Sequence, residues 1–453
     1  CALEVGVGKT PTRIAVAART RQEGRARRIM CVLPNTIMLK WEKEIRRALP
    51  DYRVLLIGLQ KYVGRAGVLR SRTDTDSERA LKYRQFQAGE YDIALVTYSM
   101  FGRTGLREET LRKFVAATAP LQRELGLRAR NTIGSFEAAA EKDQKKQQPK
   151  KKKKKATLGA VRKLLGNEAV DAASLSELGQ MRIEVAERLA AQQAEQQDEL
   201  RTLLESLTDI TERNRAVFSL EVDRWIAEQL EGQEQDPGIY WEDLKVDLLL
   251  LDEAQNFKNL WAVSEREGGV PKFLGAIQEG SQRAWNFATR AFDVRERNGG
   301  TGVVLLSATP AKNSPLEYFT LLGYVAGDAW SRLGITDTEV FIDRYLRLEE
   351  RTLIEVDLTK KKRMVVAGFQ NLNELRDVIF RYAEFRTAQE VGLKLPETKV
   401  ETRAVDMTPA QKGQYEELVV DYADALKKAG LGEDRQAKMK ALGLLQSMSL
   451  VSI

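Results

Sequence analysis

Short apolar runs separated by helix-like stretches constrain the fold of this chain more than any other feature. The runs are hydrophobic along most of their length, whereas strands with one solvated face alternate apolar and polar residues. They lie at 28–34, 53–57, 91–97, 246–251 and 302–306, and a stretch with apolar residues at helical spacing follows the first run at 36–49. Strands of this kind, joined by helices, predict an α/β fold whose parallel sheet is covered on both faces.

A change of composition divides the chain. Residues 105–240 are rich in Glu, Gln, Lys, Arg, Ala and Leu, and their pattern from 175–230 is helical. Because strand-like sequence then resumes, we predict one α/β domain in two parts, 1–104 and 241–330, interrupted by a helical insertion. The sequence that follows is helical in pattern and charged, so 331–400 is interpreted as a helical connector.

The net charge of +7 is concentrated in one place, because six lysines form an unbroken run at 150–155. The rest of the chain is almost neutral, so the basic balance is weak support for a nucleic-acid surface on the folded part. We interpret the run as a solvated, disordered loop within the insertion. A targeting signal and a nonspecific phosphate contact are the alternatives.

The two cysteines, Cys1 and Cys31, and the absence of histidine limit the chemistry. They exclude a disulfide framework, a thiol-rich zinc site and any histidine-based catalysis, and they favour a reducing, intracellular setting. No apolar run is long and uncharged enough to span a membrane, and no signal peptide is visible. A glycine-rich loop begins within the first ten residues, where a core strand normally precedes it, so we expect the sequence to be a fragment.

That loop carries the first chemical motif, Gly6-Val7-Gly8-Lys9-Thr10. Its glycines let backbone N–H groups turn inward around phosphate oxygens, and the following helix adds its positive N-terminal end. Lys9 would reach the terminal phosphates, and the Thr10 hydroxyl can bind magnesium. The strict pattern requires a further glycine where Leu3 stands, so a chance glycine-rich turn is the alternative.

Two further motifs directly follow apolar strands. Asp252-Glu253 stands where open α/β sheets bind ligands, at the carboxyl end of a strand. Asp252 would hold Mg²⁺ and Glu253 would orient the attacking water, although an acidic helix cap is the simpler alternative. Ser307-Ala308-Thr309 could link the pocket to a neighbouring surface, unless it is an ordinary strand-to-helix turn. The order of the three motifs is far more specific than any one of them.

With these motifs in this order, the chain resembles the Swi/Snf-type family of superfamily-two ATPases. That family's first motif lacks the early glycine, so the departure at Leu3 from the strict phosphate loop is expected, although the family usually has Asp there. Gln255 stands where the family's acidic motif usually has His. The resemblance also rests on Val32 to Asn35 with Trp41 and Glu44, on Thr97-Tyr98, on Lys258-Asn259, on Asn313 and Glu317, and more loosely on Arg386, Leu395-Pro396, Gln411 and Tyr415.

The resemblance implies the ATP-binding, RecA-like lobe of a DNA-dependent ATPase that moves on duplex DNA. ATP would contact Glu4, Gly6, Val7, Gly8, Lys9, Thr10 and Gln255, with Mg²⁺ at Thr10 and Asp252. Lys9, Asp252 and Glu253 would act in hydrolysis, and Ser307, Ala308 and Thr309 in coupling. DNA would contact Pro34, Asn35, Thr97 and Tyr98.

The family also needs a second lobe, of which 401–453 would be only the start, so this chain would carry an incomplete active site. We expect a DNA-associated cytoplasmic protein of phage or plasmid type, possessing no membrane partner, whose insertion could bind another protein. Two alternatives remain. One is a vestigial nucleotide-binding scaffold whose insertion binds a partner, and the other is an RNA-directed helicase.

Overall fold

The computed structural model describes residues 1–3, 7–63, 69–144, 210–231, 235–236, 238–263, 270–272, 274, 280–311, 314–354, 360–393, 401 and 406–430. The chain separates into two compact units, Cys1–Gly105 with Gln235–Ile453, and Leu106–Glu234. The predicted lysine-rich loop lies outside the described residues. Within them, no helix is both long enough and apolar enough to cross a membrane.

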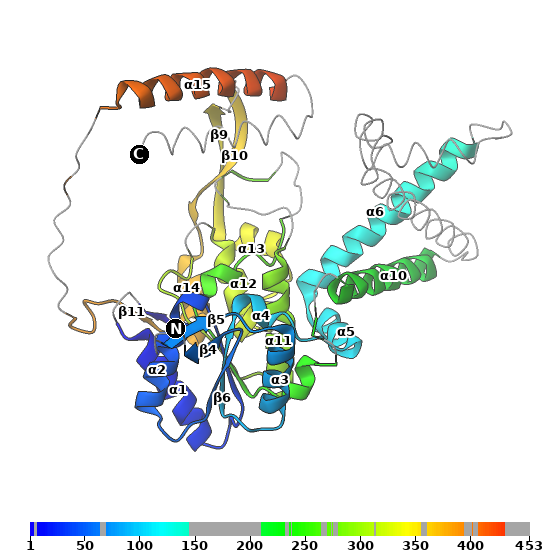
Figure 1. Cartoon of the computed structure of the whole chain (residues 1–453). Coiled ribbons are helices and arrows are strands. Elements are labelled where there is room, and N and C mark those ends of the chain that lie inside the picture. The colour runs from blue at the N-terminus through cyan, green and yellow to red at the C-terminus, as the bar shows by residue number, and fades with distance from the viewer. Residues whose placement is uncertain are drawn as a thin grey trace, which may run out of the picture. The chain divides into compact units, whose positions relative to one another are not determined.

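A five-stranded parallel sheet forms the centre of the first unit (Figure 1). Its strands follow the order β3-β6-β2-β7-β8, and every neighbouring pair is parallel. The strands are β2 (Ile29–Leu33), β3 (Val54–Ile57), β6 (Ile93–Thr97), β7 (Leu248–Leu251) and β8 (Val303–Leu305). Each coincides with one of the predicted apolar runs, so the predicted α/β class with a parallel sheet is confirmed.

Helices cover both faces of this sheet. Because side chains alternate along a strand, Cys31 and Leu95 face one layer while Val32 and Val96 face the other. The first layer packs against α1 (Lys9–Gln22) and α2 (Met38–Ala48), which share one apolar cluster with the sheet. The other elements around the sheet are η1 (Asn35–Ile37), α3 (Asp76–Gln87), α4 (Tyr98–Phe101), η2 (Trp241–Leu244), η3 (Ala254–Phe257), α11 (Gln282–Arg297) and α12 (Leu316–Val325).

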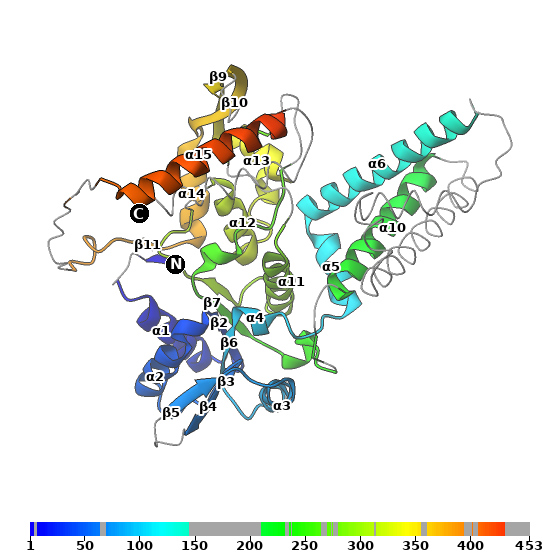
Figure 2. The ribbon, with the colours of Figure 1, turned by 45° about the horizontal axis from the view of Figure 1, so that its top comes forward.

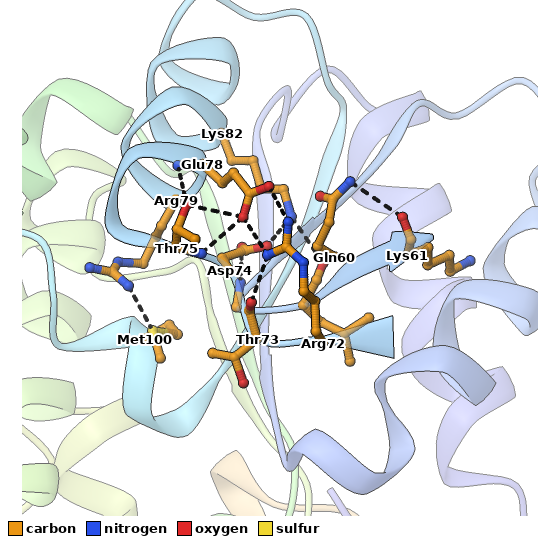
Figure 3. A network of polar contacts seen from close by, with 12 residues as sticks. Gln60, Lys61, Arg72, Thr73, Asp74, Thr75, Glu78, Arg79, Lys82 and Met100 are labelled. Atoms are coloured by element: carbon orange, nitrogen blue, oxygen red, sulfur yellow. Dashed lines mark hydrogen bonds and ion pairs between the residues drawn. The ribbon is translucent and has the colours of Figure 1, made fainter. Parts of the chain in front are cut away.

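A polar network fastens the excursion after β3 to helix α3 (Figure 3). The chain leaves the sheet as an antiparallel pair, β4 (Gln60–Val63) and β5 (Leu69–Arg72), that sequence analysis did not predict. The buried Asp74 carboxylate accepts hydrogen bonds from the Gly58 amide at 2.7 Å and from Lys82 at 2.6 Å. Thr75 and Glu78 then form a reciprocal cap that begins α3.

A second pair of short strands sits beside the phosphate loop. β1 (Ala2–Leu3) pairs in parallel with β11 (Phe385–Arg386), and the Leu3 amide also donates to the Ser307 carbonyl at 3.1 Å. The strand that leads into the loop is therefore held on one side by residues following β8 and on the other by β11. Sequence analysis missed both strands.

The region after residue 330 corrects one prediction. We expected helices there, and the structure has η4 (Ser331–Leu333), α13 (Thr338–Tyr345) and α14 (Leu372–Tyr382). Between them, however, β9 (Leu346–Ile354) and β10 (Lys360–Phe369) form a long antiparallel ribbon. The helical interpretation is wrong for these residues because their cross-strand pairing replaces helical hydrogen bonds. Further along the chain, α15 spans Pro409–Gly430.

The second unit consists, in its described part, of α5 (Glu108–Ala117), α6 (Ala119–Gln144) and α10 (Ile210–Glu231). Helices α6 and α10 lie side by side (Figure 2). Their contact is apolar where Ala129 of α6 meets Val217 of α10. Helix α5 also contacts α10, because Phe114 stacks on Trp225 with ring centroids 6.1 Å apart. The described residues of this unit are therefore mainly helical.

Candidate functional site

The predicted motifs meet at one edge of the sheet because parallel strands present their carboxyl ends together. Asp252 follows β7, and its amide donates to the carbonyl of Val32 in β2 at 2.9 Å. The Tyr98 hydroxyl, just after β6, donates to the Asp252 carbonyl at 2.6 Å. Ala254 donates to the carbonyl of Leu306, which follows β8, at 3.0 Å. Residues far apart in sequence thus form one connected surface.

The phosphate loop ends in a conformation that requires glycine. Gly8 has φ of 102° and ψ of 38°, in the left-handed region, and it caps α1, which begins at Lys9. No atom of the described residues lies within 4 Å of where a Cβ on Gly8 would stand. The exposed amides at a helix N-terminus attract anions. Of the predicted ATP contacts, Glu4 and Gly6 lie outside the described residues, whereas Val7, Lys9 and Thr10 are placed at this helix start.

The two consecutive carboxylates have different surroundings. Asp252 is 5% exposed, and its Oδ1 accepts from the Glu253 amide at 2.7 Å and from Arg13 Nη2 at 2.5 Å. Glu253 has φ of 48°, an uncommon conformation for a residue with a side chain and one associated with functional turns. Its carboxylate accepts from Gln255 Nε2 at 2.8 Å. Asp252 is therefore buried and paired with the cation of Arg13, whereas the Glu253 carboxylate is held separately by its hydrogen bond from Gln255.

A chain of hydrogen bonds connects the acidic motif to the segment after β8. Gln255 donates to Glu253 through its amide nitrogen, and its Oε1 accepts from the Ser307 hydroxyl at 2.6 Å. The Thr309 amide in turn donates to Ser307 Oγ at 3.0 Å. The Gln255 side chain can form both links because an amide carries a donor and an acceptor. These hydrogen bonds connect residues 307–309 to the carboxylate of Glu253.

The residues predicted to contact DNA differ in exposure. Asn35 is exposed and Pro34 is half-buried, whereas the side chain of Thr97 is buried at 1% exposure. Tyr98 is half-buried, its ring meets Phe257 edge-on with centroids 5.0 Å apart, and burial raises the pKa of its phenol. Tyr98 therefore anchors the edge of the sheet through both its ring and its hydroxyl.

A second carboxylate–cation pair joins two of the family-like positions. Lys258 Nζ lies 2.6 Å from Glu317 Oε1, and both side chains are largely buried. Glu317 also accepts from the Ser314 amide at 3.2 Å, at the start of α12. This contact joins the segment after β7 to the segment after β8. The neighbouring Asn313 lies outside the described residues.

Arg13 lies next to the acidic motif and was not among the predicted site residues. Its side chain is 1% exposed, and its guanidinium carbon lies 4.6 Å from the centroid of the Trp41 ring. The available signal was its spacing, because residues four apart share one face of a helix and Lys9 begins α1.

Comparison with known proteins finds one family model that matches part of the chain. Residues 281–450 match the model of the SNF2-related domain. This part of the chain is therefore similar to the SNF2-related domain. The matched range includes α11, β8, Ser307 to Thr309 and Glu317, whereas the phosphate loop and Asp252-Glu253 precede it.

Two individual proteins are also similar to this chain. Defense against restriction protein B of Escherichia phage P1 is 29% identical over 196 residues, which are 43% of this chain and 9% of that protein. The Sulfolobus solfataricus SWI2/SNF2 ATPase core in complex with dsDNA matches with a TM-score of 0.33 and 12% identity, covering 99% of this chain and 53% of that one. The chain thus spans about half of one relative and under a tenth of the other.

Proposed function

We propose that this chain is the ATP-binding lobe of an SNF2-type, DNA-dependent ATPase that moves along duplex DNA. The observation that carries the proposal is the linked edge of the sheet, where Glu253, Gln255 and Ser307 are joined beside Asp252 and the start of α1. The arrangement supports the proposal because the residues predicted to bind phosphate, to act in hydrolysis and to couple it to DNA are close to one another. The family match, which includes Ser307, supports the same reading.

The described residues fit a magnesium nucleotide. The N-terminus of α1 offers amides and Lys9 for the phosphates, and Thr10 and Asp252 supply the hard oxygen ligands that Mg²⁺ prefers. Bound Mg²⁺ would neutralise charge that develops on the transferred phosphoryl group. Glu253 would hold and polarise the attacking water, with its carboxylate oriented by Gln255.

Binding of nucleotide tests the pocket directly. Lys9→Ala should abolish binding of a fluorescent ATP analogue in the full-length protein, because it removes the cation that reaches the terminal phosphates. Lys40→Ala is the matched control, since that lysine is exposed on α2. Glu253→Gln should bind the analogue normally but block turnover. Unchanged affinity in Lys9→Ala would refute the pocket.

Duplex DNA would lie against the loop ends beside the sheet, where Asn35 is exposed. Contacts there would reach phosphate and sugar, so they would position the protein without reading sequence. Stimulation of ATP hydrolysis by duplex DNA, compared with single-stranded RNA, separates this proposal from an RNA-directed helicase. Binding should weaken steeply with salt because counterions are released, and a flat salt dependence would count against DNA binding.

A further inference from the structure

Arg13 places a buried positive charge against the carboxylate assigned to the metal. Arg13 is 1% exposed and Asp252 is 5% exposed, and Nη2 lies 2.5 Å from Oδ1. Arg13 stands one helical turn after Lys9, so the same helix presents one cation to the phosphates and one to Asp252. The second cation has no part in the function proposed above.

The Arg13 guanidinium is held between the Asp252 carboxylate and the ring of Trp41. Its carbon lies 4.6 Å from the Trp41 ring centroid, and Trp41 itself is buried. Arg13 Nε is buried and has no hydrogen-bond partner among the described residues. An unpartnered buried N–H is unfavourable, and a buried ion pair contributes little more than an apolar replacement. Stability alone therefore gives no reason for an arginine here.

The pairing divides the two oxygens of Asp252. Oδ1 accepts from Arg13 and from the Glu253 amide, whereas Oδ2 accepts no hydrogen bond from any residue in the described ranges. One oxygen is therefore left for a cation, but the carboxylate's charge is already balanced. Among the described residues predicted to contact ATP or to act in hydrolysis, the other two charged side chains, Lys9 and Glu253, add one charge of each sign. A divalent ion gains little electrostatic energy at such a site until further negative charge arrives.

We propose that Arg13 makes metal binding conditional on the nucleotide, which rests on the ATP site proposed above. With Arg13 balancing Asp252, free Mg²⁺ is not retained, and the ion enters only with the negatively charged triphosphate. Arg13 is a positioning residue in this scheme, since it acts through Asp252. Mg²⁺ is commonly held by one or two carboxylates together with substrate phosphates, which agrees with an entry of this kind.

Titration of the full-length protein with Mn²⁺, followed by electron paramagnetic resonance in the absence of nucleotide, tests the proposal. Wild type should show no saturable site, whereas Arg13→Met, which keeps the length of the side chain without the charge, should gain one. We expect the affinity to rise at least about tenfold, the effect of one unit charge about 6 Å from a divalent ion even at the dielectric of water. Arg13→Lys should behave like wild type, and adding Asp252→Asn to Arg13→Met should remove the new site.

Arg19→Met is the control, because Arg19 lies on the same helix but is exposed and pairs with Glu23. Equal Mn²⁺ binding by wild type and Arg13→Met would overturn the proposal and leave Arg13 a purely structural residue. If Arg13→Met does not fold, Arg13→Gln takes its place. Wild type also provides a test that needs no Arg13 variant. If wild type binds Mn²⁺ without nucleotide, and Asp252→Asn removes that binding, the proposal is overturned. Failure of the ATP site is distinguishable, because wild type would then not bind the fluorescent ATP analogue with Mg²⁺ present.

Discussion

Removal of the Gln255 side chain tests the link between the acidic motif and the segment after β8. Gln255→Ala deletes the 2.8 Å bond to Glu253 and the 2.6 Å bond from Ser307. A hydrogen bond to a charged group contributes about 1.5–3 kcal/mol, and the Glu253 carboxylate loses such a partner. If about 1.4–2.7 kcal/mol of this orients Glu253 in the transition state, kcat falls roughly tenfold to a hundredfold.

The assay is DNA-stimulated ATP hydrolysis by the complete protein, measured together with the affinity for a fluorescent ATP analogue. Gln255→Ala should lower kcat and leave that affinity unchanged, because in the proposed site the phosphates would be held by Lys9 and the start of α1. Ser307→Ala should lower kcat less. The double variant should fall short of the sum by at least about 0.5 kcal/mol, as expected for residues in contact. Additive effects, or a loss of ATP affinity with unchanged kcat, would refute the proposed link from Ser307 through Gln255 to Glu253.

The remaining predictions concern stability and reactivity. Arg79→Met should lower the free energy of unfolding by about 3–5 kcal/mol in a denaturant titration, because it leaves the buried Asp236 without its partner at 2.5 Å. Arg72→Met should cost at most about 1 kcal/mol, because that arginine is 46% exposed; equal losses would contradict the reasoning. Burial raises the pKa of the Cys31 thiol from 9.0 to about 12, so it should resist alkylation at pH 8 in the native state. The folded state holds that proton more tightly, so Cys31 contributes stability that is lost as pH rises from about 9 to about 12; rapid native alkylation would refute this.

The central sheet could be predicted because its strands are buried on both faces. Such strands are continuously apolar, as in β2 and β7, and their pattern does not depend on distant partners. The ribbon of β9 and β10 could not be predicted in the same way. Its strands carry charged residues such as Lys361 and Lys362 that are exposed, so no apolar alternation marks them. The two-residue strands β1 and β11 are too short to leave any periodic signal.

The candidate site was predictable to the extent that its residues follow strands. Asp252, Glu253 and Ser307 stand directly after apolar runs, and their convergence follows from the parallel arrangement. The linking role of Gln255 could not be predicted, because the bonds depend on the turn at Glu253. Arg13 was missed for a different reason. An arginine on an amphipathic helix normally faces water, and only the positions of Trp41 and Asp252 show that this one is buried.

The pairing of β1 with β11 bears on when the pocket forms during synthesis. Ala2 lies opposite Phe385, so the strand that enters the phosphate loop finds this neighbour only after nearly all the described chain has left the ribosome. Contacts of such long sequence separation form slowly, because the intervening chain must be ordered first. The whole helical unit Leu106–Glu234 is translated in the interval. The strand that enters the predicted phosphate loop therefore gains its second neighbour late in synthesis, and a nascent chain halted before β11 would hold this strand on one side alone, through the residues that follow β8.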